Sequence, residues 1–182
     1  MKKGRQTLKF GAEKDIGHGY IALTPLDIEE SDRDPFAYAG PWCLKEKKEC
    51  NKPVIIDKKS EDVLIELTKK AENTFEEVMP VVASAMNNIH CVNKSAKYWN
   101  ILVGYALRMQ IGFLIDRYYI VKKIEELYPQ SNLVLLKQKN YNVISEAREF
   151  KKRAMFSDRF NLQLFSKVAK FTTLGCDRTE LG

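Results

Sequence analysis

The stretch SAKYWNILVGYALRMQIGFLIDRYYIVKKIEELYP, residues 95–129, decides the fold of this 182-residue chain. Ser95 is a favourable N-cap for a helix that runs to about Leu127, and Pro129 ends it. Apolar residues surround the axis of this predicted helix, which is typical of a helix buried in a larger body. We therefore expect a helix whose burial needs more protein than 182 residues supply. Arg108 argues against a membrane span, because a central arginine costs about 2.5–3.5 kcal/mol on insertion scales.

The N-terminal side predicts a strand and further helices. HGYIALTP (18–25) is predicted to be a short buried strand that ends at Pro25, and PVIID (53–57) is either a second strand or a loop. After Ser60, apolar residues recur every three or four positions as far as Val78, which predicts an amphipathic helix. Pro80 is expected to bend or break it before a second helical stretch over 81–89.

The C-terminal side predicts one more strand and a final helix. NLVLLK (132–137) is a predicted strand that follows a helix, as in a βαβ unit. A last helix is expected from about Tyr141 or Asn142 to Gly175, with apolar stripes along it. The predicted fold class is α/β and helix-dominated, with a few short, parallel strands and long packed helices. The predicted organisation is a basic N-terminal segment (1–17), a single helix-rich α/β domain (18–175) and a tail (176–182).

The net charge of +6 is concentrated near the two ends of the chain. Residues 1–14 hold five basic and one acidic residue, and residues 145–170 hold seven basic and three acidic residues. Such ends could contact phosphate, nucleic acid or an anionic membrane surface, or they could be ordinary solvated charge. We do not expect a nucleic-acid partner, because the periodicity of residues 150–160 explains their phenylalanines as a core stripe.

Several classes of site have no motif in the sequence. It lacks the P-loop, GxSxG, GxGxxG and HExxH patterns, and none of its four cysteines has CxxC spacing. We therefore expect no metal site and no resident cofactor. Residues 1–14 are charged and lack the apolar core of a signal peptide, so we expect a cytoplasmic protein with reduced thiols.

Two polar residues stand at the predicted junction between helices, in NIHCVN (88–93). His90 could act as a general base near neutral pH, or it could be a satisfied structural histidine. Asn93 could bind a ligand, or it could cap a helix end or a turn.

Charged and aromatic residues within apolar surroundings are the other candidates. Arg108, Asp116 and Arg117 interrupt the long helix, so each should meet a partner or a cavity. Asp116 is a second catalytic candidate, and Arg117 and Tyr118 could bind a phosphate or carboxylate group of a substrate. A structural network of ion pairs explains the same charges equally well. Trp42 could stack on a sugar or serve in packing.

The order and spacing of several residues resemble a known family. HGYIALTP (18–25), GPWC (40–43), NIHCVN (88–93), Tyr98-Trp99, Gly104 and IDRY (115–118) look like the N-terminal region of a transferase family found in bacterial O-antigen and surface-polysaccharide biosynthesis regions. The resemblance covers residues 18–127.

The resemblance implies a glycosyltransferase-like enzyme built from two domains, of which this chain is the N-terminal portion. A sugar nucleotide would be the donor and a glycan the acceptor. A C-terminal domain, or a separately encoded partner chain, would complete the activity at the inner face of the cytoplasmic membrane. His90, Asp116 and Arg117 are then expected to converge on one cavity. The alternative is a non-catalytic helical interaction module, or a truncated remnant, that binds a partner chain.

Overall fold

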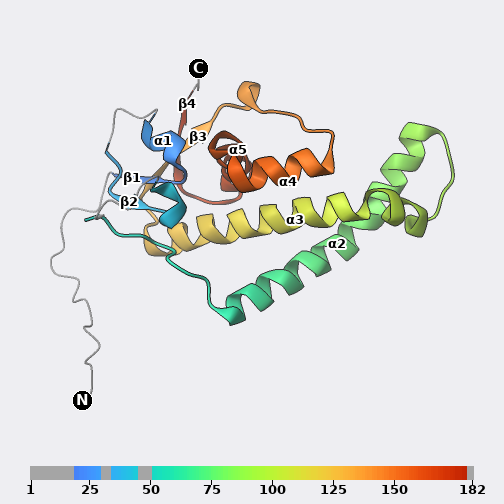
Figure 1. Cartoon of the computed structure of the whole chain (residues 1–182), viewed down its shortest axis with the longest axis horizontal. Coiled ribbons are helices and arrows are strands. Elements are labelled where there is room, and N and C mark those ends of the chain that lie inside the picture. Colours follow the sequence, from blue (N-terminus) through green and yellow to red (C-terminus); the bar gives the residue numbers. More distant parts are fainter. Residues whose placement is uncertain (1–18, 30–33, 45–50, 180–182) are drawn as a thin grey trace, which may run out of the picture.

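The computed structural model describes residues 19–29, 34–44 and 51–179 (Figure 1). The predicted basic segment 1–17 lies outside the described residues, as does Cys50. The described chain combines a small parallel sheet with long helices, which confirms the predicted helix-dominated α/β class. None of the helices in these ranges is long and apolar enough to cross a bilayer.

Four parallel strands form the sheet in the order β2-β1-β3-β4. They are β1 (Tyr20–Ala22), β2 (Ala37–Tyr38), β3 (Asn132–Leu136) and β4 (Gly175–Thr179). The register places Ile21 opposite Ala37 on one side and opposite Leu133 on the other. The segment 53–57 pairs with the sheet at one isolated parallel bridge, Val54 to Tyr38, flanked by backbone hydrogen bonds of Pro53, Ile55 and Ile56, so it lies between the strand and the loop readings. The predicted tail contains β4, so the sheet extends beyond the expected boundary at Gly175.

Two helices, α2 (Glu61–His90) and α3 (Ala96–Leu127), form a long antiparallel hairpin. Their starts follow from the sequence, because the side chains of Ser60 and Ser95 accept hydrogen bonds from the backbone N–H groups of Val63 and Tyr98. Of the predicted bend or break at Pro80, the structure excludes the break, because Pro80 lies inside α2 without ending it. A proline removes one backbone hydrogen bond, and the packing of the residues around it against α3 keeps the helix continuous.

The predicted final helix is two helices, α4 (Ala147–Phe156) and α5 (Asp158–Val168). Ser157 separates them, because its side chain accepts a hydrogen bond from the backbone N–H of Phe160 and so caps a new helix. The predicted start was also too early, since residues 141–146 are not helical and Val143 is 97% exposed.

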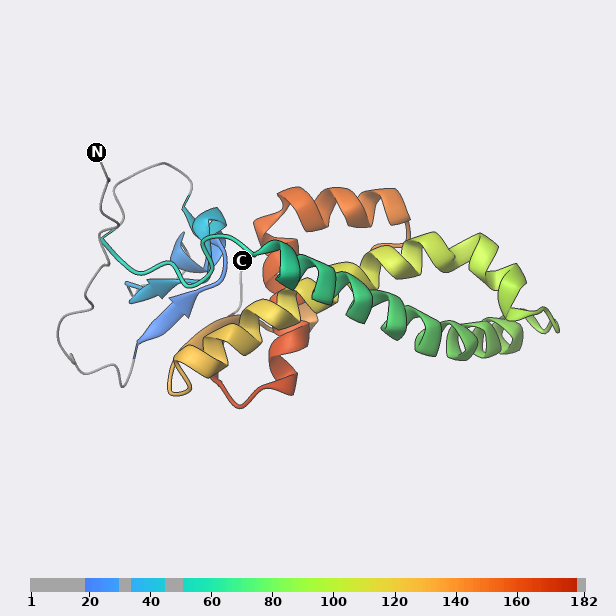
Figure 2. The same cartoon turned by 90° about the horizontal axis from the view of Figure 1, so that it is seen from below.

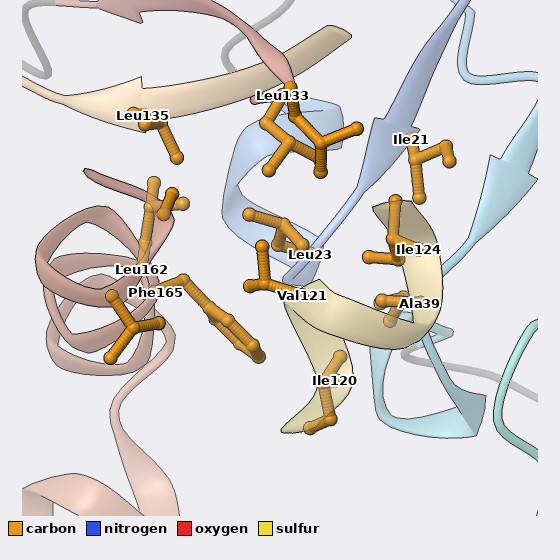
Figure 3. Packing of buried hydrophobic residues seen from close by; sticks show 14 of the residues in the cluster. Ile21, Leu23, Ala39, Ile120, Val121, Ile124, Leu133, Leu135, Leu162 and Phe165 are labelled. Carbon is orange, nitrogen blue, oxygen red and sulfur yellow. The ribbon is translucent and has the colours of Figure 1, made fainter. Parts of the chain in front are cut away.

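The main core lies between the sheet and the C-terminal half of α3, with α5 beside it (Figure 3). Ile120, Val121 and Ile124 of α3 pack against strand residues such as Ile21 and Leu133. Leu162 and Phe165 of α5 close the same cluster. On the other face of the sheet, the short helix α1 (Pro25–Glu29) contributes Ile28 to a cluster around Tyr20 and Ala22.

A separate core holds the hairpin together. Phe75, Met79 and Ala83 of α2 pack against Trp99 and Ile111 of α3. The part of the hairpin that contains this second core extends away from the sheet (Figure 2). The expectation that α3 is buried on all sides therefore fails for its N-terminal half, which, among the described residues, packs chiefly on α2. Met109 near the middle of α3 also packs against the cluster formed by α4 and α5. The C-terminal half of α3 meets the prediction.

Candidate functional site

The sheet topology points to the carboxyl ends of β1 and β2. From β1 the chain passes first to β2 on one side and later to β3 on the other. In open parallel sheets, ligands bind beyond the carboxyl ends of the strands, near the point where the direction of winding changes. Thr24 stands two residues beyond β1, and the 3₁₀ turn Pro41–Cys43 follows β2.

A cavity of about 250 Å³ opens at this edge. Residues from six parts of the chain line it: the turn after β1, the 3₁₀ turn after β2, the segment just before α2, the C-terminal half of α3, and the helices α4 and α5. The lining side chains are Thr24, Trp42, Lys59, Asp116, Arg117, Ile120, Met155, Asp158, Asn161 and Phe165.

The Asp116 carboxylate is held between two cations in this cavity. Lys59 Nζ lies 2.6 Å from Asp116 Oδ1, and Arg117 Nη1 donates to the other carboxylate oxygen. The three side chains are partly buried, so solvent screens their interaction less than at an open surface. Asp158 adds a second negative charge to the lining, so the formal charges of the cavity balance.

Arg117 is fastened to α5 as well. Its Nε and Nη2 atoms lie 3.2 and 2.7 Å from Asn161 Oδ1, and Nη2 also donates to the Ala154 carbonyl oxygen at 3.4 Å. Most of its donors therefore face acceptors of the protein itself. This arrangement favours a role in positioning Asp116 over the bidentate binding of a ligand phosphate.

The turn after β1 is built on a buried carboxylate, that of Asp27. Its oxygens accept hydrogen bonds from the backbone N–H groups of Leu23 and Thr24 at 2.7 and 2.9 Å, and from Thr24 Oγ1 at 3.2 Å. Burial raises the pKa of Asp27 to about 6, against the opposing effect of these hydrogen bonds. Thr24 followed three residues later by Asp27 has the spacing of a capping box, which the sequence analysis missed.

The GPWC segment (40–43) contacts the same turn after β1. Trp42 Nε1 donates to the Leu23 carbonyl oxygen at 3.0 Å, while the ring remains 41% exposed at the cavity. Cys43 Sγ lies 3.3 Å from the Ala22 carbonyl oxygen, and burial raises the pKa of its thiol to about 12. Trp42 therefore contributes a partly exposed aromatic ring to the cavity lining, whereas Cys43 is an inert core residue.

His90 lies far from this cavity. Its ring stacks on Trp99, with centroids 5.5 Å apart, at the distal end of the hairpin. Seventeen residues separate Trp99 from Asp116 on α3, which corresponds to about 25 Å along the helix axis. The expectation that His90, Asp116 and Arg117 share one cavity is therefore wrong.

The remaining predicted site residues also lie outside the cavity. Asn93 is exposed in the loop between α2 and α3, where Asn87 makes the structural hydrogen bonds to the Lys94 backbone. Arg108 pairs with Glu72 at 3.2 Å and lies 3.6 Å from the centroid of the Phe75 ring.

Tyr118 is partly buried, and Lys70 Nζ lies 5.3 Å from its ring centroid. Of the predicted residues, Trp42, Asp116 and Arg117 line the cavity. Lys59 and Asn161 were missed, because no local motif marks them.

Comparison with known proteins places the chain in a family. No curated protein matches it, and no solved structure does. A family model described as "LIC12162 family transferase" matches residues 20–181, a span that includes the sheet, the helical hairpin and every lining residue of the cavity. The match covers nearly the whole chain, and the protein therefore belongs to the LIC12162 family of transferases.

Proposed function

We propose that this transferase is glycosyltransferase-like, acts in bacterial surface-polysaccharide (O-antigen) assembly, and binds a sugar in the Asp116 cavity. The observation that carries the proposal is a carboxylate held by Lys59 and Arg117 beside the partly exposed ring of Trp42, at the carboxyl edge of a parallel sheet. Carboxylates accept hydrogen bonds from sugar hydroxyls, and an aromatic face can pack against the C–H face of a sugar ring. The balanced charge of the lining suits a neutral polyhydroxylated ligand.

In the proposed reaction Asp116 orients the acceptor sugar and accepts its proton. The acceptor hydroxyl oxygen bonds to the anomeric carbon of the donor while the bond from that carbon to the nucleoside diphosphate breaks. The hydroxyl proton passes to the Asp116 carboxylate, and the leaving phosphate keeps the bonding electrons. Lys59 and Arg117 act as positioning residues because they hold the carboxylate, and Asn161 acts through its hydrogen bonds to Arg117.

The donor diphosphate needs another binding surface. The cavity measures about 250 Å³ and has no excess of positive charge with which to bind a diphosphate. We propose that a C-terminal domain or a separately encoded partner chain binds the sugar nucleotide and completes the cleft. Sugar nucleotides are cytoplasmic metabolites, so the proposed site of action is the cytoplasm, at the inner face of the membrane.

Ligand binding to single variants tests the cavity. We expect saturation-transfer NMR to detect binding of mono- or oligosaccharides to the chain. Replacement of Asp116 by Asn should weaken that binding about tenfold, as expected for loss of a charge-assisted hydrogen bond. Trp42→Ala should weaken it by a similar factor.

Matched controls are available on the described surface. Asp62→Asn removes an exposed carboxylate at the start of α2, and Tyr105→Ala removes an exposed ring on α3. Both should leave sugar binding unchanged. Equal sugar binding by the wild type, Asp116→Asn and Trp42→Ala would contradict the proposal.

A non-catalytic helical module that binds a partner chain is the second candidate function. The exposed apolar side chains on the N-terminal half of α3 favour it. It differs from the first candidate in one measurable respect: no sugar and no sugar nucleotide should bind the chain, alone or with its partner.

A further inference from the structure

The distal end of the α2–α3 hairpin exposes a set of large apolar side chains that no described element covers. Tyr98, Ile101, Leu102 and Tyr105 lie at helical spacing on one side of α3, and Ile101 and Tyr105 are 76% and 69% exposed. Ile89 and Val92 are also exposed, at the turn of the same hairpin. We call these six residues the tip surface.

The charges around the tip surface have one sign. No Asp or Glu occurs between Glu77 and Asp116, a span that includes the whole turn of the hairpin. Lys94 Nζ lies 5.6 Å from the centroid of the Tyr98 ring, and Lys97 stands one helical turn before Ile101. Neither lysine forms an ion pair with any residue that the structure describes. Apolar, aromatic and basic side chains are therefore mixed at the tip, without a carboxylate.

We infer that the tip surface docks on an anionic membrane surface. Aliphatic side chains can enter the boundary between headgroups and acyl chains, tyrosine favours that boundary, and lysines are attracted to anionic headgroups. Each lysine near such a surface strengthens binding about fivefold.

A second copy of this chain is a poorer occupant of the tip surface. A symmetric dimer through this surface would bring Lys94 and Lys97 of both copies together, and the tip has no acidic residue to compensate them. An anionic bilayer supplies that compensation.

The position of the tip surface suits docking in which the hairpin holds the rest of the protein at a distance from the membrane. Ile101 and Asp116 are fifteen residues apart on α3, or about 22 Å along the helix axis. The sheet lies at the opposite end of the hairpin (Figure 2). Docking at the tip leaves the Asp116 cavity unobstructed, and the inference holds whether or not that cavity binds a sugar.

Co-flotation of the whole chain with vesicles tests this inference. We expect the chain to float with vesicles of phosphatidylcholine containing about one-third phosphatidylglycerol, and to stay in solution with pure phosphatidylcholine. The substitutions Ile101→Asp and Leu102→Asp, made together, should weaken binding at least tenfold, because they place charge where apolar side chains enter the lipid. Lys94→Gln with Lys97→Gln keeps the apolar side chains and should weaken binding to anionic vesicles about 25-fold.

The control is Val143→Asp, which places one such charge at a 97% exposed aliphatic residue outside the hairpin; Ile101→Asp alone is the variant matched to it in charge. Val143→Asp should float like the wild type, and circular dichroism checks that every variant is folded. Absence of vesicle binding by the wild type would overturn the inference. So would equal loss of binding in the Val143→Asp control, or a concentration-dependent dimer in sedimentation velocity that Ile101→Asp dissociates.

Discussion

Replacement of Asp27 by Asn tests the buried carboxylate beneath the candidate site. Asp27 is fully buried, and burial raises its pKa from the usual 3.8 to about 6. The folded state therefore holds this proton more tightly than the unfolded state does. The resulting stabilisation is fully present below pH 3.8 and is lost as the pH rises through about 6. At 1.36 kcal/mol per pH unit, the difference between the two pKa values corresponds to about 3 kcal/mol.

Urea unfolding followed by circular dichroism between pH 4 and pH 8 measures this effect. Asp27→Asn should lower the free energy of unfolding at all pH values, because the amide N–H₂ group faces backbone donors that the carboxylate accepts. The cost should be about 2–3 kcal/mol larger at pH 4 than at pH 7, since only the wild type loses stability over this range through Asp27.

The exposed-site variant Asp62→Asn serves as the control for the same exchange of carboxylate for amide at the surface. If the free energies of unfolding of the wild type and Asp27→Asn changed in parallel with pH, the reasoning would be refuted. A cost that grows as the pH rises would show that the three hydrogen bonds to the carboxylate outweigh its burial.

Three further predictions follow from burial and backbone geometry. Iodoacetamide at pH 8 should alkylate the exposed Cys91 in the folded protein and leave Cys43 unmodified. The reason is that Cys43 is buried and the pKa of its thiol is raised to about 12. Peptide mass spectrometry checks which cysteine is modified. Pro80→Ala should raise the free energy of unfolding by about 1–3 kcal/mol in a urea titration, since the exposed Pro80 interrupts the hydrogen bonding of α2; an unchanged or lower stability would contradict this. Phe75→Ala should lower the free energy of unfolding by about 3–5 kcal/mol in the same titration, because the ring is 1% exposed and Arg108 packs on it. A loss below about 1 kcal/mol would argue against the hairpin core.

Local signals predicted the long helices well. Ser60, Ser95 and Pro129 mark helix ends through hydrogen bonds, or through a missing N–H, within a few residues of chain, so no tertiary information is needed. The same kind of signal was present at Ser157, but the apolar stripes on either side of it suggested one helix. Strand β4 was missed because GCDRT has one apolar residue, and an edge strand needs little more than a partner on one side.

The candidate site was predictable only in part, for a geometric reason. Asp116 and Arg117 could be identified because charged residues interrupt an apolar helix, and such charges need partners. Their partners Lys59 and Asn161 are 57 and 44 residues away along the chain and have no common motif with them. His90 was grouped with them because all three belong to the motifs that carry the family resemblance, and the order of motifs along the chain does not show that the long helix α3 separates them in space.

The separation of the hairpin cluster from the main sheet cluster also has a consequence for local unfolding of the protein. Within the described ranges, the apolar cluster of the distal half of the hairpin, around Phe75 and Trp99, is built from α2 and α3 residues, while the sheet cluster holds the proximal half of α3. The distal half should therefore unfold locally as a separate cooperative unit, with a smaller free energy of opening than the sheet. In native-state hydrogen exchange, amides near Ala83 and Val103 should exchange together, and before those of Leu133 and Leu135. Local unfolding would then begin at the end of the hairpin and reach the sheet last.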